Sequence, residues 1–265
     1  MKKHYPFEFI YQVFSLLVII IVVHAAYVAI IRPNAKAELE QQAAQLKIDK
    51  DYVTKRSIYV LVRDYEQEAC FILMFWSLFI MTYKGLNLFR ESRLLEKDIL
   101  HAKDGIKFLP QDTHELERQI QTLPEEEQKY LLPRALNIAL HRFSSTENIQ
   151  DVSSAATNVC ESESERLDSE LSIIRYITWA IPSIGFLGTV RGIGDALGQA
   201  HKAVEGDIAG VTESLGVAFN STLIALCISI VLMFIVHQLQ LLQERFILDT
   251  QNYCNNNLIR HLQVS

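Results

Sequence analysis

Four stretches of the chain are apolar over roughly the 20 residues that a helix needs to cross a bilayer. They lie within residues 1–31, which include the N-terminus, and at residues 69–89, 172–198 and 212–237. The first stretch contains a single ionisable interruption, His24, and the second ends near Lys84, whose long side chain can reach the interface. This pattern predicts an all-α polytopic membrane protein with four transmembrane helices and long helical cytoplasmic extensions.

The polar segments between these spans are also predicted to be mainly helical. Residues 32–68 are rich in Ala, Glu, Gln, Lys and Leu, and we expect an external helical hairpin or cap in which Pro33 begins a helix. The remaining segments are predicted to be a cytoplasmic helical domain, a short periplasmic loop and a cytoplasmic C-terminal helix, at residues 90–171, 199–211 and 238–265.

The distribution of basic residues near the spans sets the predicted orientation. Most of them flank ends that would then be cytoplasmic: Lys2, Lys3, Lys84, Arg90, Arg93, Lys97, Arg166, Arg175 and Arg245. Residues 32–68 hold seven basic residues, but an equal number of acidic residues blunts their effect. We therefore expect a multi-pass protein of the bacterial inner (cytoplasmic) membrane with both termini in the cytoplasm. A cleavable signal peptide ending near Ala25 and Ala26 is the alternative for the first span.

Composition and motifs argue against several other classes of protein. The net charge of −6 and the absence of a dense basic cluster exclude nucleic acid as an expected partner. The cysteines lie far apart, at Cys70, Cys160, Cys227 and Cys254, so neither a metal site nor a disulfide framework is indicated. The sequence contains no HExxH or GxSxG motif. We therefore expect no catalytic residues, no bound metal and no cofactor.

Glycine is concentrated in the third span, where five of the ten glycines lie between Gly185 and Gly198. Each glycine weakens a helix by about 1 kcal/mol relative to alanine, but small residues let membrane helices approach closely. Helical spacing places one stripe of residues along the span, comprising Thr178, Pro182, Gly185, Thr189 and Gly192, and Gly188 lies four residues before Gly192. The span is therefore predicted to pack tightly against other helices while presenting a hydroxyl.

The fourth span carries a matching hydroxyl. Its small and polar residues share one region: Ala218, Thr222, Ala225 and Ser229 lie on one face, with Asn220 and Ser221 beside them. With a rise of 1.5 Å per residue, Thr189 lies about 21 Å from the inner edge and Thr222 about 12 Å from the outer edge of a core of about 30 Å. We interpret Thr189, Thr222, Ser221 and Asn220 as an ion pathway. The alternative for Thr189 is that its hydroxyl only bonds a carbonyl one turn back.

Arg191 is an unusual residue for a membrane span. It lies about 200° around the helix from Thr189, away from the proposed lining. An unpartnered arginine at this position would be costly, so an ion pair is expected, with Asp195 or Glu213 as the partner. A role in gating or charge filtering is the alternative.

Two sequence segments, PSIGFLGTVRGI at 182–193 and AFNSTLIAL at 218–226, resemble the MotA/TolQ/ExbB proton-channel family. The family's GxxGTV segment is matched by Gly185, Gly188, Thr189 and Val190, and its second motif by Ala218, Phe219 and Thr222. Arg191 and Ala225 depart from the pattern, because members often have an apolar residue and a glycine there. The four-span arrangement is similar to MotA, whereas the GFLGTV sequence motif is closer to TolQ and ExbB.

The resemblance implies a homo-oligomer, expected to be a pentamer, around a dimer of a single-span partner. That partner would carry a membrane-embedded aspartate near the level of the threonines, as MotB, TolR and ExbD do. The complex would be a stator-like energy-coupling motor that conducts protons, with sodium as the alternative ion. The competing hypothesis is a non-conducting oligomeric membrane scaffold of an envelope or secretion assembly.

Overall fold

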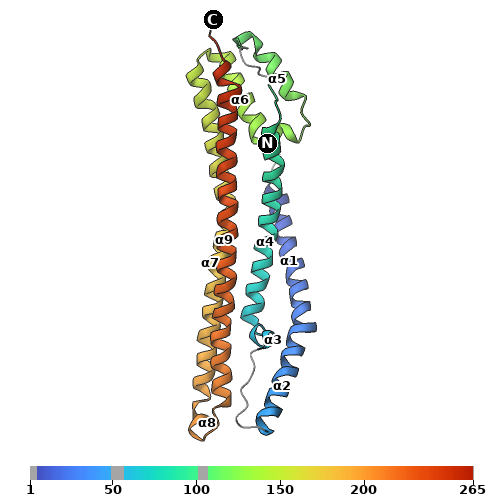
Figure 1. Ribbon diagram of the computed structural model, residues 1–265, viewed down its shortest axis with the longest axis vertical. Helices are drawn as coiled ribbons and strands as arrows, with labels where there is room; N and C mark the ends of the chain where they lie inside the picture. Colours follow the sequence, from blue (N-terminus) through green and yellow to red (C-terminus); the bar gives the residue numbers. More distant parts are fainter. Residues whose placement is uncertain (1–4, 49–56, 101–106, 265) are drawn as a thin grey trace. The chain divides into compact units, whose positions relative to one another are not determined.

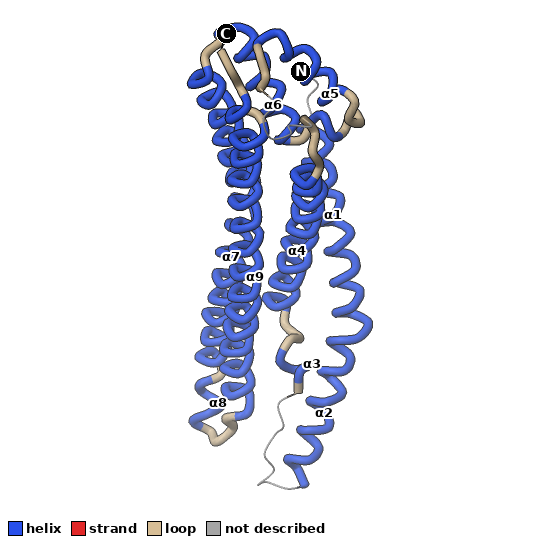
Figure 2. The backbone as a smooth tube through the Cα atoms, turned by 45° about the horizontal axis from the view of Figure 1, so that its top comes forward, coloured by secondary structure: helices blue, strands red, loops and turns tan. Residues whose placement is uncertain are grey.

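The computed structural model describes residues 5–48, 57–100 and 107–264, which are helical almost throughout (Figures 1 and 2). Four helical segments are long and apolar enough to cross a membrane, and they are Ile10–Gln45, Tyr65–Glu96, Ile149–Gly198 and Ala209–His261. Within the described ranges there is no strand, only an isolated bridge between Phe108 and Leu262. The predicted all-α fold with four membrane helices is confirmed.

The chain divides into two compact units. Unit 1 comprises Met1–Met81 and Ile173–Val236, and unit 2 comprises Thr82–Ser172 and His237–Ser265. Three helices contribute to both units: α4 (Tyr65–Ser92), α7 (Ile149–Gly198) and α9 (Ala209–Asn257). Within each unit, α7 and α9 run side by side (Figures 1 and 2).

The first helix of unit 1 continues past the predicted end of the first span. Helix α1 (Tyr5–Ala26) passes through a π-helical turn (Tyr27–Ile31) directly into α2 (Arg32–Ile48). Pro33 is the second residue of α2, near a helix start as expected, but α2 continues α1 without a break. Proline lacks an N–H and crowds the preceding turn, and the wider π turn, in which Arg32 N–H bonds the Tyr27 carbonyl, accommodates it.

The rest of the expected external cap is only partly described. Residues 49–56 lie outside the described residues, and α3 (Ile58–Leu61) is a single turn capped by the Ser57 side chain. Helix α4 then begins at Tyr65, four residues before the predicted boundary of the second span. The first turn of α4 therefore contains two acidic residues, Glu66 and Glu68.

Helix α7 contains a proline that would ordinarily disrupt it. The helix follows Asn148, whose Oδ1 accepts the Gln150 N–H at 2.9 Å, and it contains Pro182 in its interior. Since Pro182 has no N–H, the Thr178 carbonyl one turn earlier loses its usual donor. The Ser229 hydroxyl of α9 donates to that carbonyl at 2.9 Å, and both residues are buried. The contact between helices thus satisfies the group that the proline leaves open.

Unit 2 is held by a core of large apolar side chains. Helices α5 (Thr113–Gln121) and α6 (Leu131–Thr146) enclose it with parts of α7 and α9, and short 3-10 turns lie at Arg93–Glu96, Pro110–Asp112, Glu127–Lys129 and Ile259–His261. Its fully buried members include Leu136, Leu140 and Phe143, which come from one face of α6. Helix α8 (Ala200–Val204) lies in unit 1, between α7 and α9 in sequence.

Ion pairs tie the helices of unit 2 together around this core. Glu163 of α7 is 4% exposed and pairs with Arg166 at 2.5 Å and with Arg134 of α6 at 3.2 Å. Burial alone would raise the pKa of the Glu163 carboxyl, but the hydrogen bond and charge of Arg166, together with Arg134, outweigh burial and lower its pKa. Lys84 of α4 is 2.6 Å from Glu170 of α7.

Candidate functional site

Three glycines of α7 allow close contact with α9 in unit 1. A Cβ added at Gly188 would lie 2.6 Å from the Ser221 Cβ, and one at Gly192 would lie 2.7 Å from the Ala218 Cβ. Gly185 faces Ala225 and the Ser221 carbonyl. We call this contact the glycine seam. It is formed on α7 by Gly185, Gly188 and Gly192, and on α9 by Ala218, Ser221 and Ala225.

The other glycines of the cluster have no such role. A Cβ at Gly194 or Gly198 would meet nothing within 4 Å. Among the residues that the structure describes, the spacing of Gly194 and Gly198 therefore does not correspond to a helix contact, whereas the spacing of Gly188 and Gly192 does.

The glycine seam brings the two predicted threonines into contact. The Thr189 and Thr222 hydroxyls form a hydrogen bond between α7 and α9, and we call them the threonine pair. The Thr222 hydroxyl also lies 3.0 Å from the Gly185 carbonyl, and the Thr189 hydroxyl lies 3.2 Å from the Ala218 carbonyl. Both residues are partly buried. Their shared depth, expected from helical rise alone, agrees with this contact.

The threonine pair has more acceptors than protons. Each hydroxyl has one proton and two lone pairs, and the carbonyls of Gly185 and Ala218 add further acceptors. Two protons can satisfy only two of these bonds at a time, so oxygen lone pairs remain available. An arrangement of this kind can accept a further hydrogen bond or help to coordinate a cation.

The two polar residues preceding Thr222 differ in their surroundings. Ser221 is fully buried in the glycine seam, and its Oγ has no hydrogen-bond partner among the described residues. Asn220 is partly buried and does not join the hydrogen bonds of the threonine pair. Ser221 therefore supplies a further hydroxyl near the depth of the threonine pair. Asn220 takes no part in the hydrogen bonds of that pair.

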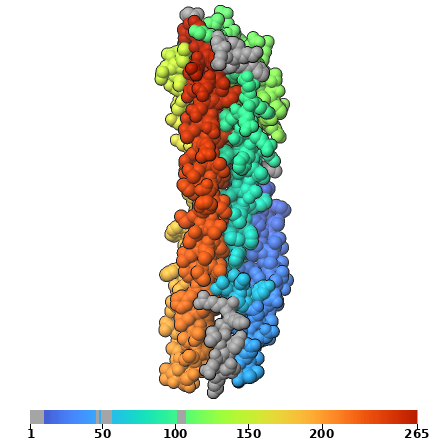
Figure 3. Space-filling view, viewed as in Figure 1, coloured from blue at the N-terminus to red at the C-terminus, as the bar shows by residue number. Residues whose placement is uncertain are grey.

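An open groove lies beside the threonine pair. It has a volume of about 580 Å³ and is lined by Thr222 and by mainly apolar residues, among them Trp179, Pro182, Phe186 and Leu226. Trp179 is 73% exposed and Phe186 is 64% exposed. The unit 1 part of α9, orange in Figure 3, adds further exposed apolar side chains. Such a surface suits lipid or other membrane helices rather than water.

The partner of Arg191 differs from both expected ones. Arg191 Nε lies 2.8 Å from Glu66 Oε1 of α4, and Glu213 pairs instead with Arg63 at 2.7 Å. Asp195 is exposed and forms no ion pair with Arg191. The expectation of Asp195 or Glu213 as partner is therefore wrong, because α4 begins before the predicted second span and its first turn brings Glu66 to Arg191. That an ion pair exists is confirmed.

Further charged residues that the sequence did not single out gather at the beginning of α4. Glu68 is largely buried and pairs with Arg32 at 2.5 Å and with His24 at 2.7 Å. Arg32 also lies over the Tyr65 ring, 4.3 Å from its centroid. These contacts join the first and second membrane helices. The signal that could have indicated them is the pair of glutamates, Glu66 and Glu68, directly before an apolar span.

Comparison with known proteins gives one match. Residues 124–252 match the family model described as MotA/TolQ/ExbB proton channel family. The matched range includes the threonine pair and the glycine seam. No curated protein and no solved structure matches the chain.

Proposed function

Because the chain belongs to the MotA/TolQ/ExbB proton channel family, we propose that it is the channel subunit of an inner-membrane, energy-coupling motor. In this proposal the subunit converts ion-motive force into mechanical work across the envelope. The observation that carries the proposal is the threonine pair, whose oxygens meet at the contact of two membrane helices and border an open groove.

The ion pathway would use hydroxyls from this chain and a carboxylate from another. Thr189, Thr222 and Ser221 offer oxygen atoms, and neither α7 nor α9 carries an acidic residue beside them in the sequence. We therefore propose that a single-span partner supplies a membrane-embedded aspartate, whose protonation and release would move the ion. Hydroxyl oxygens suit a proton or sodium, and the proton is the ion proposed first.

The exposed groove supports an assembly in the membrane. Exposing the polar hydroxyls to lipid would be costly, because lipid offers them no hydrogen bonds. Packing the groove against other helices would cover these hydroxyls and add van der Waals contacts to the apolar surface beside them. We propose a homopentamer surrounding a partner dimer, with both termini of each subunit in the cytoplasm. The Glu66–Arg191 and Glu68–Arg32 ion pairs would hold the first two membrane helices against the lining helices.

A non-conducting scaffold is the competing function, because hydroxyls in the glycine seam could serve helix packing alone. The two are separated by purifying the chain with its co-expressed single-span partner and reconstituting the complex into vesicles. Proton entry under an imposed membrane potential, followed with an enclosed pH-sensitive dye, is the expected result, and it should stop when the partner's membrane aspartate becomes asparagine. Native mass spectrometry should give five copies with two partners. A stable oligomer that passes no ions would favour the scaffold.

A further inference from the structure

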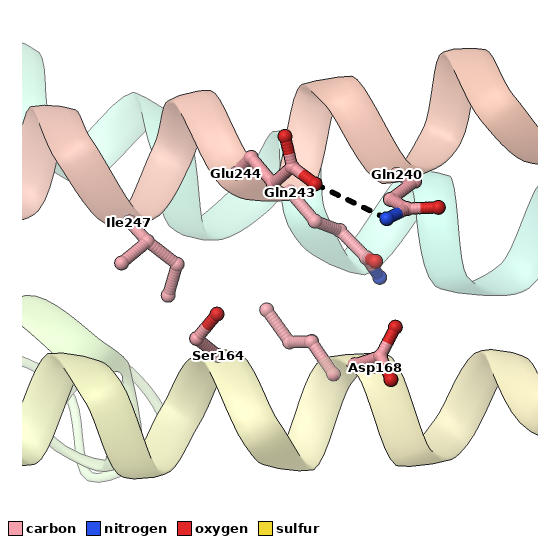
Figure 4. Close-up of a pocket in the computed structure, with 7 residues that line it drawn as sticks. Ser164, Asp168, Gln240, Gln243, Glu244 and Ile247 are labelled. Atoms are coloured by element: carbon pink, nitrogen blue, oxygen red, sulfur yellow. Dashed lines mark hydrogen bonds between the residues drawn. The ribbon is translucent and has the colours of Figure 1, made fainter.

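Buried polar atoms without a hydrogen-bond partner lie at the beginning of α4 in unit 1. Among the residues that the structure describes, they include Asp64 Oδ2 and Gln67 Nε2. At the pocket between α7 and α9 in unit 2, by contrast, Glu244 accepts a hydrogen bond from Gln240 Nε2 at 3.1 Å (Figure 4). Buried polar atoms are nearly always bonded to protein or to ordered water, so the unpaired ones indicate that water enters beside the first turn of α4.

The same turn of α4 brings a carboxylate side chain to the glycine seam. A Cβ built on Gly188 would lie 3.3 Å from Glu66 Cγ and 2.8 Å from Ser221 Oγ, so both side chains border the same point on α7. Ser221 is fully buried, and its Oγ also has no hydrogen-bond partner among the described residues. Glu66 therefore approaches the seam beside an unpaired hydroxyl, directly before Thr222 of the threonine pair in the sequence.

Arg191 fixes the Glu66 carboxylate in this position. Arg191 Nε lies 2.8 Å from Glu66 Oε1, and Arg191 Nη2 donates to Glu66 Oε2 at 2.8 Å. A carboxylate has about four lone-pair sites, so this pairing leaves acceptors for water. The Arg191 side chain is 43% exposed and the Glu66 side chain 16%. The negative end of the ion pair therefore lies toward the seam and favours positive charge near Ser221.

We propose that Glu66 lines an outer entrance to the ion pathway, through which water leads a cation past Ser221 to the threonine pair. The beginning of α4 lies on the external side when both termini are cytoplasmic. The Glu66 carboxylate lowers the electrostatic cost of bringing positive charge into the contact between α7 and α9, as acidic side chains do in cation channels. It acts through its charge and stays paired with Arg191. This inference rests on the proposed function, because it extends that pathway outward.

The first test removes the unpaired hydroxyl in the complex with the single-span partner, reconstituted into vesicles. Ser221→Ala takes away a buried polar group that has no protein partner, so Tm should stay the same or rise, whereas proton flux should fall about threefold or more. Ser77→Ala is the matched control, because Ser77 of α4 is also fully buried with an unpaired Oγ, and it should leave the flux unchanged. Full flux in Ser221→Ala, or an equal loss in both variants, would overturn the proposal.

The second test separates the charge of Glu66 from its part in holding the helices together. Glu66→Gln should lower the proton flux at least about fivefold. Glu213→Gln breaks the other ion pair described in this region, with Arg63 at 2.7 Å, and should change the flux less than about twofold. The exchange E66R/R191E keeps an ion pair but turns its positive end toward the seam. It should recover the Tm that Glu66→Gln loses, while the flux stays low.

The outcomes for Glu66 and for the proposed function can be told apart. Recovery of both Tm and flux in E66R/R191E would show that the ion pair only holds α4 against α7, and it would overturn the inference. A wild-type complex that conducts no better than Glu66→Gln would also overturn it, and ion flow through this complex would leave the proposed function standing. A wild-type complex that passes no protons would contradict the proposed function and this inference with it.

Discussion

The helices inside unit 1 pack in a different way from those inside unit 2. In unit 1, α7 and α9 meet at the glycine seam, where backbones approach closely and large apolar side chains such as Trp179 and Phe186 remain at the surface. In unit 2 large side chains, including Leu136 and Phe143, fill an enclosed core. Unit 2 therefore completes its own packing, whereas unit 1 leaves apolar surface for lipid or other membrane helices.

This difference implies opposite sensitivities to side-chain size. Removing atoms should damage unit 2, because a cavity forms in a filled core. Adding atoms should damage unit 1, because the glycine seam has no space for them. The substitutions below test this contrast in order of expected effect, each measured as a change in the free energy of unfolding of the purified chain in detergent.

The largest effect is expected from Phe143→Ala in unit 2. Phe143 is fully buried in the core, so the substitution should lower the free energy of unfolding by about 3–5 kcal/mol. Ile138→Ala, on the same helix but 44% exposed, is the matched control and should cost less than about 1 kcal/mol. Similar losses for both would mean that α6 does not use one face as its core face.

A smaller loss is expected from Gly192→Ala in unit 1. The new Cβ would lie 2.7 Å from the Ala218 Cβ and 2.8 Å from the Ala218 nitrogen, so α7 and α9 must separate. We expect a loss of about 1–3 kcal/mol. Gly194→Ala, two residues away with nothing within 4 Å, should be neutral or stabilising by up to about 1 kcal/mol. If Gly192→Ala were as well tolerated as Gly194→Ala, the close contact in the glycine seam would be refuted.

The smallest effect concerns the bond that compensates for Pro182. Ser229→Ala removes the donor to the Thr178 carbonyl and should cost about 1–2 kcal/mol. Pro182→Ala restores an N–H within α7, so in that background the same serine substitution should cost close to nothing. A double-mutant cycle measures this coupling, and additive effects would show that Ser229 does not replace the missing donor.

Much of the architecture follows from local sequence patterns. Apolar length is sufficient to predict four membrane helices, and helical rise is sufficient to place Thr189 and Thr222 at one depth. The periodicity of small residues also indicates which face of each span packs closely. These properties depend on one helix at a time, which explains why they could be read from the sequence. The role of the two threonines in ion flow stays a prediction.

Contacts between distant segments could not be predicted in the same way. The pairing of Arg191 with Glu66 depends on the register of α4 against α7, which no local pattern fixes. The bond from Ser229 to Thr178 likewise requires knowing which carbonyl of α7 faces α9. The unbroken passage from α1 through the π turn into α2 is not indicated by a local pattern either, because a proline such as Pro33 more often follows a break in the helix.

The central claim is that the hydroxyls of the threonine pair take part in ion flow, and valine substitution tests it directly. Valine keeps the shape of threonine while removing the hydroxyl, and Thr250→Val removes a buried hydroxyl bonded within its own helix as a control. In vesicles containing the complex with its partner, T189V/T222V should reduce the proton flux at least about tenfold, a change of roughly 1.4 kcal/mol in barrier height, while T250V leaves it unchanged. Full proton flux through a correctly assembled T189V/T222V complex would contradict the account.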